Sequence, residues 1–203
     1  MLIGVQKESF AQTTVAYSGM TSITCPASPT ATISPNVSGL TFSQITRGGG
    51  VACNSFATGI NGSGFTSATA AIALAANKFY TFNILADATT SFTVSQVVIY
   101  SSVSAVNGIT CDLQYNIDGG GNTSLGTFTP TTTGTAFTFT PGSSIPVSSS
   151  ESINFFIVPY GGSLAGTTCR ILNNTSITVT SSVIPTTFTS IQTGLWSDGS
   201  TWV

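Results

Sequence analysis

Short segments in which successive side chains alternate between two faces make up most of this chain. The pattern is clearest in residues 78–85 (KFYTFNIL), 108–117 (GITCDLQYNI) and 135–140 (TAFTFT). Residues 92–100 (FTVSQVVIY) and 167–180 (TTCRILNNTSITVT) add runs that are rich in β-branched side chains. A period of two, repeated with turn signals between the segments, is typical of an all-β sandwich or barrel.

Two segments fit this pattern less simply. Residues 68–76 (ATAAIALAA) contain good helix formers, but the run is short and follows β-type neighbours, so we favour a strand over a single helical turn. Residues 153–160 (INFFIVPY) are apolar almost throughout, which predicts a strand that is buried on both faces.

The charge content excludes several classes of function. Only ten of 203 residues are charged, and there is no histidine. A Ser-His-Asp triad and imidazole metal ligands are therefore excluded, and four cations are too few for a nucleic-acid interface. No apolar run approaches the roughly 20 residues of a spanning helix, so we expect no membrane insertion. The surface must be wetted instead by hydroxyl groups, from 29 serines and 35 threonines.

The four cysteines favour an oxidising compartment. Cys25, Cys53, Cys111 and Cys169 include no C-x-x-C pair, which argues against a zinc ribbon or a thioredoxin-like site. Four cysteines allow three pairings. We favour Cys25–Cys53 with Cys111–Cys169, because the first bond then stays within one local unit. The alternative is four buried free thiols.

Residues 118–122 (DGGGN) predict a hairpin turn whose glycines have positive φ. The same loop offers oxygen atoms, but Ca²⁺ takes six to eight ligands, and one Asp with one Asn falls short. We therefore expect no metal site and no cofactor.

Candidate ligand-binding side chains are few. Sugar binding by a β-sandwich uses aromatic rings with amide and Arg donors. Tyr100, Tyr115 and Tyr160 lie near strand ends, and Arg170 is one of few cations, so these four are the candidates. Arg170 could instead pair with Asp112, since each lies next to a cysteine of the expected second disulfide.

The carboxylates do not predict an enzyme. A glycosidase needs two carboxylates about 5–10 Å apart around a sugar. Asp87, Asp118, Glu151 and Asp198 all fall in turns or linkers, and Asp112 alone is expected on a strand. We expect no catalytic residues.

Composition shifts at both ends predict three regions. Residues 1–13 are read as the remnant of a signal peptide, because a small residue before a polar start resembles a cleavage site. Residues 14–183 form the folded unit. Residues 184–203 open with a proline-containing linker and end in a cluster that holds both tryptophans, which we read as the truncated start of a following domain.

The order of the strand segments is similar to that of a known family. The segments ANKFYTFNIL, FTVSQVVIY, CDLQYNIDGG, INFFIVPYGG and TTCRILNNTSITV resemble the strands of a jelly-roll sandwich module found in large secreted and cell-surface proteins of bacteria. The tail GLWSDGSTW resembles the G-x-W-S-D-x-x-T-W opening of a segment in surface proteins of type IX-secreting bacteria. In that family an R-I-D-N motif is found where this chain has Arg170 to Asn173, so Leu172 replaces the acidic residue.

This resemblance implies an antiparallel, jelly-roll-like β-sandwich that is secreted or displayed on a cell surface beside neighbouring domains. We expect a non-catalytic, adhesin-like module that mediates adhesion or presents its neighbours. The alternative is a carbohydrate-binding module attached to an extracellular polysaccharide-degrading enzyme. In either case the expected partner is a glycan or a surface polymer.

Overall fold

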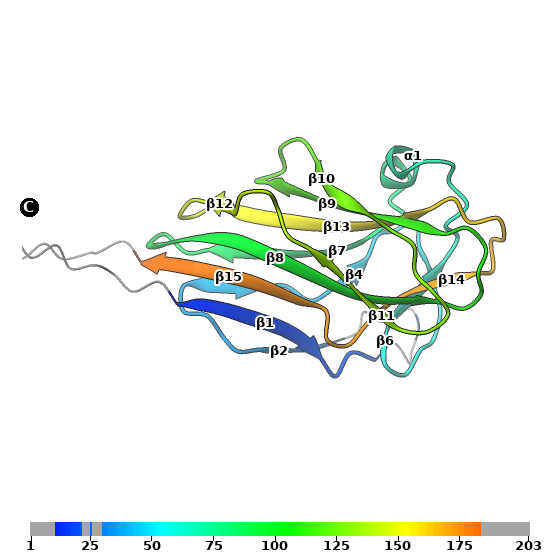
Figure 1. The fold of residues 1–203 in the computed structure, drawn as a ribbon, viewed down its shortest axis with the longest axis horizontal. Helices are drawn as coiled ribbons and strands as arrows, with labels where there is room; N and C mark the ends of the chain where they lie inside the picture. Colours follow the sequence, from blue (N-terminus) through cyan, green and yellow to red (C-terminus); the bar gives the residue numbers. More distant parts are fainter. Residues whose placement is uncertain (1–10, 22–24, 26–29, 184–203) are drawn as a thin grey trace, which may run out of the picture.

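The computed structural model describes residues 11–21, 25 and 30–183, which form fifteen strands and one short helix. Figure 1 shows their arrangement. The elements are β1 (Gln12–Ser18), β2 (Thr32–Ser34), β3 (Leu40–Phe42), β4 (Thr46–Arg47), β5 (Ala52–Cys53), β6 (Gly59–Ser63), α1 (Ala70–Ala75), β7 (Tyr80–Ala86), β8 (Thr90–Val103), β9 (Thr110–Ile117), β10 (Thr123–Phe128), β11 (Thr135–Phe139), β12 (Ile145–Val147), β13 (Ser152–Tyr160), β14 (Thr168–Leu172) and β15 (Ser176–Val183).

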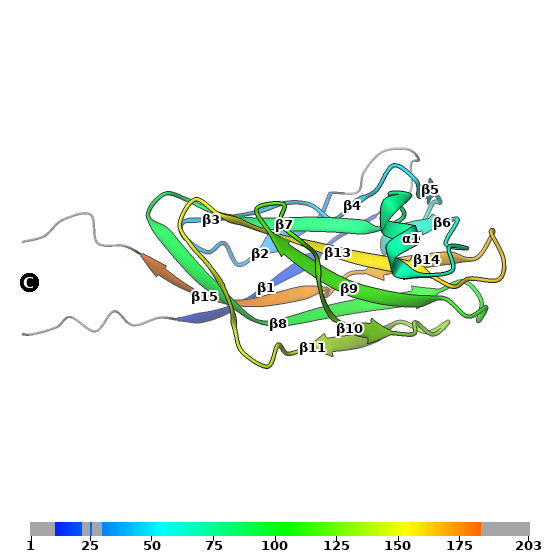
Figure 2. The same cartoon turned by 90° about the horizontal axis from the view of Figure 1, so that it is seen from above.

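The strands form two antiparallel sheets that pack face to face. Sheet A has nine strands in the order β2-β1-β15-β8-β14-β6-β5, with β11 and β12 also paired to β8. Sheet B has six strands in the order β10-β9-β13-β7-β3, with β4 also paired to β7. The chain passes repeatedly from one sheet to the other, as Figure 2 shows for β6, β7, β8 and β9. The expected all-β, jelly-roll-like sandwich is therefore confirmed.

Alternate side chains of both sheets fill the core between them. The alternation predicted for residues 78–85 is confirmed, because Tyr80, Phe82 and Ile84 share one face and are fully buried. Aromatic rings link the two layers. Within sheet B the ring of Phe82 stacks on that of Phe155, with 5.1 Å between the ring centroids, and the ring centroid of Tyr17 from sheet A lies 5.6 Å from that of Phe82. Each such side chain contributes roughly 1.5–3 kcal/mol through burial.

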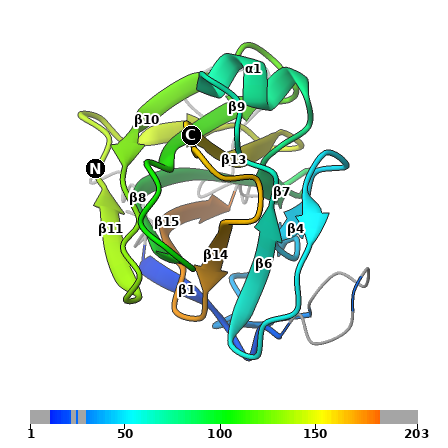
Figure 3. The ribbon, with the colours of Figure 1, turned by 90° about the vertical axis from the view of Figure 1, so that its right-hand side faces the viewer.

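Residues 68–76 contain a helix, so the prediction of a strand there was wrong. Thr69 caps α1, since its side chain accepts a hydrogen bond from the backbone N–H of Ile72. The helix packs against β13 on the outside of sheet B (Figure 3), where Ala73 and Val158 are fully buried. A cap and one buried apolar position are enough to fix a helical turn of this length.

The turns follow the sequence closely. The predicted hairpin turn is present between β9 and β10, where Asp118 and Gly119 have φ of 48° and 74°, but Gly120 and Gly121 do not have the positive φ expected of them. Asn174 has φ of 75° and lies in the turn that separates β14 from β15.

The three predicted regions stay a prediction. β1 begins at Gln12, two positions before the expected start of the folded unit at residue 14. Its first two residues pair with Thr180 and Val179 of β15. The interpretations of residues 1–10 and 184–203 lie outside the described residues.

Candidate functional site

Three asparagines form one row across the outer face of sheet B. Asn154 of β13 lies directly opposite Asn83 of β7 and Asn116 of β9 in the strand register. The residues before and after each of them pack into or against the core, so the three amides point away from it. Asn83 and Asn154 are half-exposed and present both donors and acceptors, whereas Asn116 is buried beside them.

An aromatic row lies beside the amides. Phe156, two residues after Asn154, is directly opposite Thr81 of β7 and Gln114 of β9. The ring of Phe79 meets that of Phe156 edge to face at 5.3 Å, and both rings are half-buried. We call this surface the amide face, which consists of Thr81, Asn83, Gln114, Asn116, Asn154 and Phe156.

A chain of hydrogen bonds fixes how these amides are oriented. Asn154 Nδ2 donates to Asn116 Oδ1 at 3.0 Å, and Asn116 Nδ2 donates to Asn122 Oδ1 at 2.7 Å. Asn122 Nδ2 then donates to Gln114 Oε1 at 3.2 Å, and Gln114 Nε2 donates to Asp112 Oδ2 at 2.7 Å. All four bonds run in one direction along the chain.

Asp112 sets that direction. Its carboxylate is an acceptor only, so the amide beside it must present an N–H, and each earlier amide must do the same in turn. Ser124 Oγ donates to the other carboxylate oxygen of Asp112 at 2.5 Å. A surface whose amides are already oriented loses little conformational entropy when a ligand binds.

A groove borders the amide face. It has a volume of about 300 Å³ and lies where the chain passes from β3 to β4. Ser43 is held there by two backbone contacts: its N–H donates to the Asn83 carbonyl, and its Oγ accepts from the Asn83 N–H. The groove is lined by Ser43, Gln44, Thr46, Thr81, Phe82, Asn83 and Asn154.

The exposed part of β13 departs from the expectation of a strand buried on both faces. Asn154 and Phe156 are half-exposed on the outer face of β13. Val158, farther along the same face, is buried where α1 packs on the strand. The apolar run was a misleading signal because one of its phenylalanines, Phe156, faces the surface.

The four predicted ligand-binding residues do not come together. Tyr100 and Arg170 share the outer face of sheet A, where Arg170 lies opposite Ser102, two residues after Tyr100 on β8. Tyr115 packs partly against the core and lines a groove between β10 and the segment after β11. Tyr160 lies on the outer side of sheet B at the end of β13, beyond Val158.

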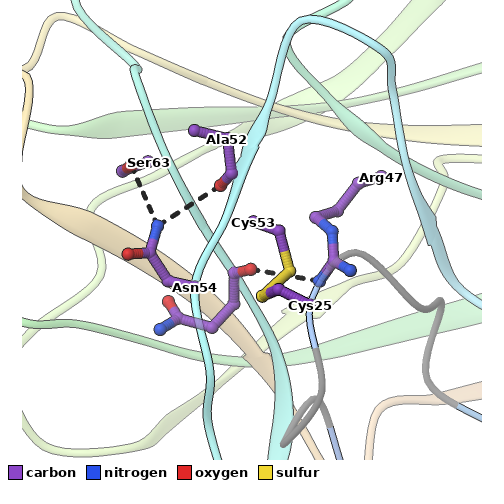
Figure 4. Close-up of a disulfide and its surroundings, with 7 residues drawn as sticks. Cys25, Arg47, Ala52, Cys53, Asn54 and Ser63 are labelled. Carbon is purple, nitrogen blue, oxygen red and sulfur yellow. Dashed lines mark hydrogen bonds between the residues drawn. A yellow bond between two sulfur atoms is a disulfide. The ribbon is translucent and has the colours of Figure 1, made fainter.

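One of the two expected disulfides is present. Cys25 and Cys53 are bonded and join the segment before β2 to β5 at the edge of sheet A (Figure 4). Beside the bond, Arg47 Nη1 donates to the carbonyl of Asn61 at 3.2 Å, and Asn54 Nδ2 donates to Ser63 Oγ at 2.9 Å.

The prediction of a second disulfide, between Cys111 and Cys169, was wrong. Cys111 and Cys169 do meet across the two sheets, but they are free, buried thiols whose sulfur atoms are 3.8 Å apart. A tyrosine side chain spans the gap beside them, since Tyr80 of sheet B donates to the Cys169 carbonyl of sheet A. Burial raises the pKa of the Cys111 thiol, and Cys169 raises it further.

The suggested ion pair between Asp112 and Arg170 is also absent from the described residues. Asp112 lies on sheet B and is bound by Gln114 and Ser124, whereas Arg170 lies on sheet A under the ring of Phe56. The suggestion depended on Cys111 and Cys169 being bonded. Both cysteines point into the core, so the next residue along each strand, Asp112 or Arg170, points to the outer face of its own sheet.

Within residues 11–21, 25 and 30–183, no group of three or more Cys, Asp or Glu side chains comes together as a metal site. The same part of the chain contains no helix with the length and apolar character that a membrane crossing requires.

No protein-family profile and no curated protein matches this chain. Among solved structures, a family two carbohydrate esterase from Cellvibrio japonicus is similar at 12% identity and a TM-score of 0.33, over 87% of this chain and 36% of that one. The carbohydrate-binding protein TmCBM61, solved with β-1,4-galactotriose, is similar at 12% identity and a TM-score of 0.34, over 72% of this chain and 89% of that one. This chain thus spans about a third of the esterase, and both likenesses are too distant to assign a function.

The amide face was missed at the level of sequence, although part of its signal was present. Asn83, Asn116 and Asn154 each interrupt a strand pattern at an outward position. What the sequence lacks is the register between β7, β13 and β9, which are far apart along the chain and only align once the sheet has formed.

Proposed function

We propose that this chain is a non-catalytic, extracellular module that binds a glycan through the amide face. The alignment of Asn83, Asn154 and Asn116 beside the half-exposed ring of Phe156 carries the proposal. A sugar ring has C–H groups on its faces, which pack on an aromatic ring, and hydroxyl groups at its edge, which pair with amides.

The protein context follows the interpretation of the sequence. We place the module in a secreted or cell-surface bacterial protein, where glycan binding serves adhesion or the presentation of neighbouring domains. The Cys25–Cys53 disulfide supports an oxidising compartment. In the alternative context, the same face tethers a polysaccharide-degrading enzyme to its substrate.

The placement of the carboxylates supports a binding role over a catalytic one. Each carboxylate in the described residues accepts a hydrogen bond from its own turn or from an adjacent strand: Asp87 from Thr89, Asp112 from Ser124, Asp118 from Ser152 and Glu151 from Ser148. The chain has no histidine to act as a general base in their place.

A polysaccharide panel with the full chain tests the proposal. We expect binding to at least one neutral polysaccharide in affinity gels and by calorimetry. The association constant should fall about tenfold or more in Phe156→Ala, which removes the apolar platform. Asn83→Ala should weaken binding by about five- to tenfold through the loss of one hydrogen bond. The Asn83 side chain makes no hydrogen bond to the described residues, so this second variant leaves the fold intact.

Thr138→Ala, an exposed position on β11 of sheet A, is the matched control and should bind as the wild type does. The proposal fails if no neutral polysaccharide binds, or if both variants bind it as tightly as the control. The panel also separates the contexts: selective binding of one plant or storage polysaccharide favours the enzyme-attached module, and binding of cell-surface glycans favours adhesion.

A further inference from the structure

Arg170 occupies a central position on the outer face of sheet A. It lies between Asn61 of β6 and Ser102 of β8 in the strand register. Its neighbours Cys169 and Ile171 are fully buried in the core, so the Arg170 side chain points to the outside.

This cation has no anionic partner among the described residues. The four carboxylates described above are all bound at other places in the fold. Partly burying a charge is unfavourable unless another group compensates for the lost hydration. Arg170 is half-buried, and among the described residues the compensation comes from an aromatic ring.

The ring of Phe56 fixes the guanidinium. The Arg170 Cζ atom lies 4.4 Å from the Phe56 ring centroid, so the ring covers one side of the planar group. Arg170 Nε is buried and has no hydrogen-bond partner among the described residues. No hydrogen bond joins the two terminal nitrogens to these residues either, so the described residues offer the fork of N–H donors no acceptor.

Two further polar atoms around Arg170 are buried and unpaired. Asn61 is only 3% exposed, yet its Oδ1 accepts no hydrogen bond from the described part of the chain. Thr168, two residues before Arg170 on the same face, has an unpaired Oγ1. Most buried polar groups in proteins have a partner, and several unpaired ones at one place indicate a missing water or ligand.

We propose that Arg170, with Asn61 beside it and Phe56 over it, forms a second binding site that takes the carboxylate or sulfate group of an acidic saccharide. The planar fork of Arg matches two oxygens of an oxyanion. A hydroxyl group next to the oxyanion, or a water that it holds, supplies a donor to Asn61. Tyr100, a diagonal neighbour of Arg170 across β14 and β8, gives the adjoining sugar ring an aromatic surface.

This site lies on the opposite side of the sandwich from the amide face, and it does not depend on the proposed function. The amide face is built on sheet B from uncharged groups, whereas this site is built on sheet A around a cation. The two are therefore separable by variant and by ligand.

Affinity electrophoresis and calorimetry of the full chain test the site. The probes are polygalacturonate, a sulfated galactan, a neutral galactan and inorganic sulfate. We expect the chain to bind at least one acidic polymer. Arg170→Gln should weaken that binding about tenfold or more through the loss of charge-assisted hydrogen bonds. Arg170→Lys keeps the charge but loses the fork, and should also weaken it. Competition by sulfate alone distinguishes a site for any oxyanion from one that needs the sugar.

Lys78→Gln is the matched control, because it removes one positive charge near α1, away from the site. It should bind the acidic polymer as the wild type does. Equal losses of affinity in Lys78→Gln and Arg170→Gln would show general charge attraction and overturn the proposal. Unchanged binding in both Arg170 variants would also overturn it, and so would the absence of binding to either acidic polymer. Phe56→Leu, which keeps the cation and removes the ring, covers the case in which Arg170→Gln does not fold. It should weaken binding, and unchanged binding would count against the site.

Discussion

At the scale of single residues, two tyrosines use their hydroxyl groups to join distant parts of the backbone. Tyr80 Oη donates to the Cys169 carbonyl at 2.5 Å and so crosses from sheet B to sheet A. Tyr17 Oη donates to the Ser43 carbonyl at 3.0 Å. Burial raises the pKa of both phenols, because an ionised oxygen would lose its hydration there.

Replacing Tyr80 with Phe should lower the free energy of unfolding by about 1–3 kcal/mol, because the buried carbonyl of Cys169 loses its donor. Urea unfolding at neutral pH measures this. Tyr115→Phe is the control, since its hydroxyl makes no hydrogen bond within the described residues, and it should change stability by much less. An effect in Tyr80→Phe no larger than in the control would contradict the role of the bond.

The same variant has a signature in pH. The folded state keeps the Tyr80 proton above pH 10 or so, where an unfolded chain releases it. Stability is therefore fully present below a pH of about 10 and falls as the pH rises further. The fall should be shallower in Tyr80→Phe, because one of the groups that produces it is gone.

At the scale of elements, the sequence predicted what depends on local pattern and missed what depends on contact between elements. The faces of β7 and β9 followed from alternation, and the turn at Asp118 followed from its glycines. Helix α1 was missed because Thr69 acts as a cap only once α1 is packed on β13. The amide face was missed because strand register is a long-range property.

The cap of α1 makes a prediction at this scale. Thr69→Ala should destabilise the protein by about 0.5–2 kcal/mol, because the Ile72 N–H loses its acceptor. Thermal unfolding of the wild type and the variant measures the loss. Thr69→Ser keeps the oxygen and should restore most of the stability, while the exposed Thr66→Ala should have little effect. Equal stability of the Ala and Ser variants would argue against the cap.

At the scale of the whole molecule, the few charges have a consistent placement. The described carboxylates are bound in turns or by adjacent strands. Oriented amides lie on the outer face of sheet B, and on the outer face of sheet A Arg170 has no carboxylate partner among the described residues. Composition predicted this class of surface but not the location of either site.

The Cys25–Cys53 bond acts at this scale because it closes a segment of the chain with a sequence separation of 28. Cys25→Ser/Cys53→Ser should lower the free energy of unfolding by about 3–4 kcal/mol, since the unfolded chain gains conformational freedom. Urea unfolding of the double variant, compared with oxidised wild-type protein, measures this, and reduced wild-type protein should unfold as the double variant does. Equal stability of the oxidised wild type and the double variant would show that the bond contributes nothing.

The pairing of β1 with β15 has a mechanical consequence. β1 begins and β15 ends at the same end of the sandwich (Figures 1 and 2), and Gln12 lies opposite Thr180. Tension applied in opposite directions through these two strand ends loads their ladder one hydrogen bond at a time, so the strands peel rather than shear. Val15 and Tyr17 of β1 are buried in the core, so core contacts break together with this ladder. Under such tension we expect the module to open first where β1 pairs with β15.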